Sequence, residues 1–150
     1  MRTAILLAAV MVVASPALAH VGVTPRESKA GATETYTFRV PSEGGKNTTS
    51  VILEVPDGVT IVSVAPREDA KTADKKTGDR ITEITWTIDI KAGAIAQLAF
   101  TAKNPARAGG IVWKVHQKYS DGTVSDWVGE AGTRSPAPVT ALVAAEVKAP

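Results

Sequence analysis

The sequence contains two histidines that could bind a metal, and the first of them, His20, follows a segment typical of export signals. Arg2 gives this segment a positive start, and residues 4–14 form a short apolar core. Residues 17–19 read Ala-Leu-Ala, which fits the small-x-small rule for signal cleavage. Cleavage after Ala19 would make His20 the N-terminal residue. Its α-amine and imidazole Nδ1 could then close a chelate ring on one metal ion, which an internal histidine cannot do.

The donors available to such a site favour Cu(II). An N-terminal amine and an imidazole both titrate near neutral pH, so a metal ion can displace their protons. Among divalent first-row metals, nitrogen and oxygen donors bind Cu(II) most strongly. The sequence has no cysteine, and its two methionines, Met1 and Met11, precede the predicted cleavage site, so the sulfur ligands that Cu(I) prefers would be missing. The alternative is that His20 merely begins a flexible terminus that binds no metal.

One bidentate residue leaves a metal site incomplete, and Glu34 is the candidate for a third ligand. It shares one face of a predicted strand with Tyr36, Phe38 and Val40, because alternate residues of a strand point to the same side. A carboxylate on an apolar face costs free energy unless it is paired or bound to a metal. Alternatively, Glu34 lies just beyond the end of the sheet and is solvated. The residue pattern leaves both interpretations open.

The other two candidates, His116 and Trp127, have less favourable surroundings. Alternation along residues 110–120 places His116 on a polar face with Lys114 and Lys118, two cations that would repel a metal ion. We therefore expect a solvated surface histidine there. Trp127 faces the same side as Ser125, and a tryptophan in a strand is usually part of the core.

The elements that must position these residues are predicted to be strands. From Thr33 onward, β-branched and aromatic residues alternate with polar ones in short runs separated by Gly, Pro, Asp and Asn. This pattern predicts an all-β, two-sheet sandwich of cupredoxin-like or immunoglobulin-like type. Asp121-Gly122 predicts a hairpin turn, and residues 67–79, rich in Lys, Asp and Thr, are predicted to be a solvated loop. The predicted strands are 34–41, 49–56, 60–65, 80–90, 95–102, 110–120 and 123–128, with a weaker one over 138–147.

Length and charge limit the classes of function. Residues 20–150 suit one domain, with a tail after Gly129 that is either a closing strand or a flexible end. Arg2 is one of 17 basic residues, so its removal leaves 16 against 15 acidic residues. This near-neutral balance gives no electrostatic case for binding nucleic acid or a membrane surface. No long apolar stretch follows Gly129, and we expect no C-terminal membrane anchor.

Several segments, taken together and in order, resemble the YcnI-like copper-binding proteins, whose mature chains start with histidine. The resemblance covers nearly all of the chain after residue 19. This sequence departs from the family pattern in two ways. Many members carry a C-terminal membrane anchor, which we do not expect here, and members often have Pro-Gly-Trp near the position where this sequence has Pro66-Arg67-Glu68. The segments that carry it are His20-Val21-Gly22-Val23-Thr24-Pro25, Ala30-Gly31, Glu34-Thr35-Tyr36-Thr37-Phe38-Arg39-Val40-Pro41, Lys103-Asn104-Pro105 and residues 119–129.

The resemblance implies a mono-histidine brace that binds one Cu(II) through the terminal amine, the imidazole and a carboxylate, next to a tryptophan. These roles fall on His20, Glu34 and Trp127, which moves Trp127 from the core to the metal site. We expect a periplasmic, non-enzymatic Cu(II)-binding protein, a copper chaperone or homeostasis factor whose partners are copper and other exported copper proteins or chaperones. The alternatives are a histidine-brace copper oxygenase, which would need His116 as a second histidine, and an immunoglobulin-like adhesion or assembly module without a metal.

Overall fold

The computed structural model describes residues 20–145, and every regular element among them is a β-strand. The predicted all-β fold class is therefore confirmed. The predicted signal peptide, residues 1–19, and the end of the last predicted strand, residues 146–147, lie outside the described residues. In the part of the chain that the structure describes, no helix is long and apolar enough to cross a membrane.

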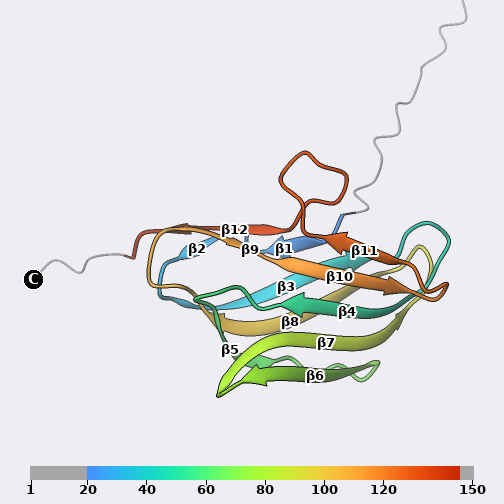
Figure 1. Cartoon of the computed structure of the whole chain (residues 1–150), viewed down its shortest axis with the longest axis horizontal. Coiled ribbons are helices and arrows are strands. Elements are labelled where there is room, and N and C mark those ends of the chain that lie inside the picture. Colours follow the sequence, from blue (N-terminus) through green and yellow to red (C-terminus); the bar gives the residue numbers. More distant parts are fainter. Residues whose placement is uncertain (1–19, 146–150) are drawn as a thin grey trace, which may run out of the picture.

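The strands form three sheets, two of which face each other across the core (Figure 1). The first contains, in spatial order, β1 (Gly22–Thr24), β3 (Thr33–Pro41), β8 (Ile95–Lys103) and β5 (Thr60–Val64). The second contains β11 (Val124–Trp127), β10 (Lys114–Tyr119), β4 (Thr48–Glu54), β7 (Arg80–Ile90) and β6 (Ala70–Thr77). The third contains β2 (Glu27–Lys29), β12 (Val139–Val143) and β9 (Gly109–Val112).

Aromatic side chains fill the space between the sheets, as the alternating pattern predicts. Tyr36 and Phe38 on β3 are fully buried, and Phe38 lies 5.2 Å from Phe100 of β8 between ring centroids. Trp86 of β7 meets Phe38 edge to face at 6.4 Å, so the first and second sheets share one core. Since the chain has no cysteine, this packing replaces disulfides in stabilising the sandwich.

The observed strands differ from the sequence prediction in three ways. The prediction that residues 67–79 form a solvated loop is wrong, because β6 pairs with β7 along its whole length at the edge of the second sheet. Its side chains are nearly all exposed, so this polar strand carries no apolar alternation to reveal it. The predicted strand 110–120 is divided at Trp113 into β9 and β10, which belong to different sheets. The short strands β1 and β2 were not predicted.

Candidate metal site

The structure brings His20 and Trp127 together, although 107 positions of sequence separate them. Their ring centroids lie 5.6 Å apart with a 59° angle between the ring planes. His20 precedes β1, and the buried side chains of Val21, just before this strand, and Val23, within it, anchor this end of the chain in the core. Trp127 ends β11 and is only 6% exposed, which confirms the core interpretation of this residue. Burial and proximity to His20 thus coexist in one side chain.

A buried amide holds the indole of Trp127 in place. Trp127 Nε1 donates a hydrogen bond of 3.0 Å to Oε1 of Gln117, which is fully buried on β10. Gln117 Nε2 donates to the Pro41 carbonyl oxygen at 2.9 Å and to Thr48 Oγ1 at 2.7 Å. Because the acceptors of Nε2 and the donor to Oε1 are all fixed, the amide has one orientation. Gln117 therefore ties β11 to β4 and to the end of β3.

Sequence reasoning did not identify Gln117 as a site residue, although its position carried a signal. It falls on the inward face of residues 110–120 with Trp113, Val115 and Tyr119, where an amide must find hydrogen-bond partners. The partners come from strands remote in sequence, so the pattern could have flagged the residue but not named what it binds.

We expect Gln117→Leu to destabilise the fold substantially and to loosen Trp127. A buried polar group left without a partner costs about 1–3 kcal/mol. The substitution removes the acceptor of Trp127 Nε1 and the Gln117 donor to Thr48 Oγ1 and to the Pro41 carbonyl oxygen. Urea unfolding of both proteins should show a lower free energy of unfolding for the variant, by at least about 2 kcal/mol. Gln97→Leu on the exposed face of β8 serves as the control. Equal losses in the two variants would contradict the role of the Gln117 amide.

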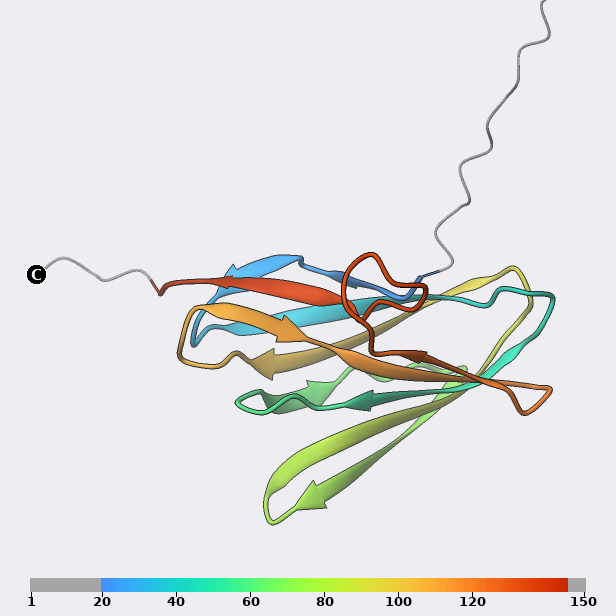
Figure 2. The same ribbon diagram turned by 45° about the horizontal axis from the view of Figure 1, so that its top comes forward.

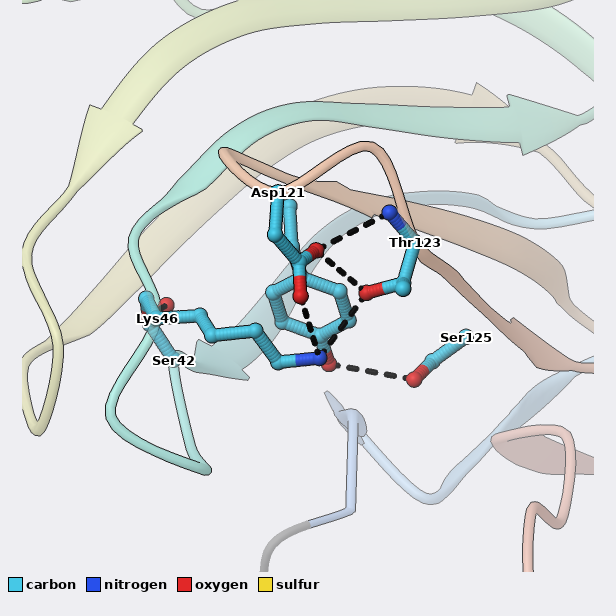
Figure 3. A network of polar contacts seen from close by, with 6 residues as sticks. Ser42, Lys46, Asp121, Thr123 and Ser125 are labelled. Atoms are coloured by element: carbon cyan, nitrogen blue, oxygen red, sulfur yellow. Dashed lines mark hydrogen bonds and ion pairs between the residues drawn. The ribbon is translucent and has the colours of Figure 1, made fainter.

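The predicted hairpin at Asp121-Gly122 joins β10 to β11 and thereby sets the position of Trp127. Gly122 has a φ of 85°, a conformation that favours glycine. Asp121 Oδ1 accepts hydrogen bonds from the backbone N and Oγ1 of Thr123, at 2.9 and 2.6 Å (Figure 3). These bonds, together with Lys46 Nζ at 3.3 Å from Asp121 Oδ2, lower the pKa of Asp121 to about 2. Lys46 also donates to Thr123 Oγ1 at 2.8 Å, which ties the hairpin to the segment before β4 (Figure 3).

Glu34 lies near the opposite end of β3 from His20. β1 pairs with β3 so that Gly22 is opposite Arg39. Glu34 precedes Arg39 by five residues, about 17 Å at the rise of a strand, while His20 lies beyond Gly22 in the other direction. The structure therefore does not bring Glu34 to His20. Its role as a copper ligand stays a prediction that its position does not favour.

The carboxylate of Glu34 instead belongs to a polar cluster between β2 and β3. Its Oε2 accepts a hydrogen bond of 2.9 Å from Ser28 Oγ, and Ser28 Oγ accepts one of 3.0 Å from Asn104 Nδ2. Tyr36 donates to Asn104 Oδ1 at 2.6 Å, and burial is the main cause that raises the pKa of Tyr36. The cost of placing a carboxylate on the inward face is thus offset by hydrogen bonding.

His116 lies on the outward face of β10, as predicted, but the expectation of a simply solvated histidine is wrong. Its Nδ1 is 2.5 Å from Asp126 Oδ1, and its Nε2 is 3.4 Å from Glu54 Oε1. Asp126 is the cross-strand partner of His116 on β11, and Glu54 lies on β4. The prediction considered only the lysines on the same strand, whereas cross-strand neighbours are as close.

This ion cluster should make stability depend on pH through His116. Burial lowers the pKa of His116, but hydrogen bonds and charge interactions with Asp126 and Glu54 outweigh it, so the pKa is raised. The stabilisation is then complete below the unfolded pKa of about 6.5 and is lost as pH rises through the folded pKa.

We therefore expect His116→Gln to lower the free energy of unfolding at about pH 5.5 and to lower it less at about pH 8.5. Urea unfolding of both proteins at the two pH values measures this difference. The same loss at both pH values would show that the imidazole acts only as a neutral hydrogen-bonding group.

The arrangement offers a metal the imidazole of His20 beside an aromatic ring rather than a full set of side-chain ligands. Among residues 20–145, no group of three or more His, Asp or Glu side chains is arranged to hold a metal ion. The carboxylates beside His116 lie on different ring nitrogens and do not converge on one point. Metal chemistry at His20 would have to use its own imidazole and, after cleavage, its α-amine.

Comparison with known proteins places the chain in a family. A family model described as a domain of unknown function, DUF1775, matches residues 20–142. The chain belongs to the DUF1775 family. This membership confirms the resemblance to YcnI-like copper-binding proteins, because a relative of this DUF1775 chain, the copper-binding protein CutI of Bacillus subtilis (strain 168), is 37% identical to it over 135 residues. The match covers 88% of the DUF1775 chain and 66% of CutI.

Solved structures agree with the fold of the DUF1775 chain. A protein from Nocardia farcinica with an immunoglobulin-like fold is 23% identical, with a TM-score of 0.71 over 82% of this chain and 97% of the other. A cohesin module from Clostridium perfringens is 11% identical, with a TM-score of 0.55 over 84% of this chain and 97% of the module. At these identities the likeness supports the immunoglobulin-like sandwich and nothing about ligands.

Proposed function

We propose that this protein, after cleavage before His20, binds one Cu(II) through the α-amine and imidazole Nδ1 of His20, outside the cytoplasm. The observation that carries the proposal is the 5.6 Å approach of the His20 ring to the buried indole of Trp127. The relative CutI, described as a copper-binding protein, supports copper as the metal. The donor set agrees, since amine and imidazole nitrogens favour Cu(II) over other divalent first-row metals.

Trp127 supplies shielding in this proposal. Its indole nitrogen is already bonded to Gln117, so the ring contributes its π face to the His20 side rather than a donor atom. An aromatic face attracts a nearby cation and excludes water from one side of it. The tryptophan therefore favours a bound metal ion without adding a ligand that would have to dissociate before the metal leaves.

A two-nitrogen site suits a protein that holds and passes copper, and we propose a role in copper delivery or homeostasis rather than an enzymatic one. A metal ion with exchangeable positions can transfer to another protein by ligand replacement. A histidine-brace oxygenase would require a second histidine at the copper. His116 is bonded to Asp126 and Glu54 on the outward face of β10, whereas Trp127 is buried on the inward side.

The direct test is the intact mass of the exported protein with and without one equivalent of Cu(II). The proposal expects a chain that begins at His20 and gains one copper. A chain that begins elsewhere, or one that gains no copper, would overturn it.

A titration of the same protein with Cu(II) tests whether Glu34 is a copper ligand. Because Glu34 lies near the far end of β3, we expect Glu34→Gln to change the Cu(II) dissociation constant by less than about threefold. Asp126→Asn, on the outward face of β11, is a matched control that removes another carboxylate. A loss of about tenfold or more for Glu34→Gln alone would show that this carboxylate reaches the metal, as the family resemblance implies.

A further inference from the structure

A hollow of about 700 Å³ opens directly beside His20. One wall is the N-terminal segment, including His20 and Gly22, and the other is formed by the loop 131–138 before β12 and by Val139 at the start of that strand. Figure 1 and Figure 2 both show this loop standing next to the first described residues. A Cβ added at Gly22 would meet nothing within 4 Å, so the space above β1 is open.

Two arginines line this hollow, and no acidic residue does. Arg39 lies opposite Gly22 in the pairing of β3 with β1, and Arg26 follows β1. Both are exposed. Within residues 20–145, neither guanidinium makes a hydrogen bond or an ion pair, whereas Arg67 and Arg80 each contact a carboxylate. The hollow is therefore a positively charged space adjoining the proposed copper site.

Positive charge beside a copper site disfavours the binding of a Cu(II) ion that has no anionic ligand. Two guanidinium groups repel a nearby Cu(II) ion unless an anion lies between them. Meanwhile a Cu(II) ion held by two nitrogens retains positions that oxygen donors can fill. A carboxylate satisfies both requirements, because guanidinium groups bind carboxylates through paired hydrogen bonds and Cu(II) accepts carboxylate oxygen.

We propose that the hollow is a binding site for a small dicarboxylate or polycarboxylate, held by Arg26 and Arg39. One carboxylate group pairs with the arginines and another reaches towards His20, where it completes the coordination of copper. The copper part rests on the proposed function, while the binding of the anion to the arginines does not. The protein would then take up copper as a carboxylate complex rather than as the free ion.

Isothermal titration calorimetry measures the binding of succinate to the metal-free protein that begins at His20. Binding is expected, and it should weaken by about tenfold or more in the double variant Arg26→Gln, Arg39→Gln. Arg107→Gln is the matched control, since Arg107 lines a different hollow and, within residues 20–145, also makes no contact with a carboxylate. Because all three arginines are exposed, circular dichroism should show folded variants.

A second measurement follows the Cu(II)-loaded protein by electron paramagnetic resonance. Succinate should change the copper spectrum of the wild type and of Arg107→Gln, but not that of the double variant. Absence of succinate binding in the wild type, or equal binding in the double variant, would overturn the assignment of the hollow. Failure of the proposed copper function would leave succinate binding to the metal-free protein intact, so the two failures are distinguishable.

Discussion

Acetylation of the α-amine of His20 in the chain that begins there should remove most of the affinity for Cu(II). The acetylated nitrogen is an amide that no longer binds the metal, so the chelate ring with imidazole Nδ1 cannot form and the copper is left with the imidazole alone. We expect the dissociation constant to rise by at least about 100-fold, equivalent to about 2.7 kcal/mol. Competition with a Cu(II) chelator measures this change.

Two controls separate the chelate from the fold. His20→Ala should be as damaging as the acetylation, while His116→Gln should leave Cu(II) affinity unchanged because His116 faces outward between Asp126 and Glu54. If the acetylated protein bound Cu(II) as tightly as the unmodified chain that begins at His20, the α-amine would not be a ligand. If His116→Gln weakened binding, a second histidine would have to be part of the site.

The second large effect is expected in tryptophan fluorescence. Paramagnetic Cu(II) quenches nearby indoles, and Trp127 is the tryptophan whose ring lies 5.6 Å from His20. We expect Trp127→Phe to remove most of the copper-dependent quenching. The other tryptophans, Trp86 and Trp113, are fully buried in the aromatic core and should respond little.

Trp86→Phe is the matched control, because it removes one indole while leaving the His20 contact. The quenching per equivalent of Cu(II) should remain in this variant. An undiminished response in Trp127→Phe, with folding intact, would mean that copper binds away from the indole and that Trp127 serves the core alone.

The sequence predicted the parts of the fold that depend on alternation. Strands whose inward positions are apolar, such as β3 and β7, were located because one face must be buried. β6 was missed because its stability comes from backbone pairing with β7 rather than from a buried side. β1 and β2 were missed because three residues are too short to display a period.

The candidate site was predictable only in part. The export signal and the chemistry of a terminal histidine pointed to His20, and a residue pattern identified Trp127 as buried. Their contact depends on the pairing of β10 with β11, and the support from Gln117 depends on β3 and β4. The register between strands that are distant in sequence cannot be predicted from any one local segment. For the same reason, the pattern could place Glu34 on a face but not at one end of β3.

The two edges of the second sheet differ in how firmly they are attached. β6 buries almost no side chain, so it can separate from β7 without exposing the core, and its amides should exchange with solvent hydrogen early. β11, at the other edge, carries the buried Trp127 and is tied to β10 and through Gln117 to β4. Local opening of the sheet would therefore begin at β6, which is separated from β11 by three strands. The contact between His20 and Trp127 can therefore persist while β6 opens transiently at the far edge of the second sheet.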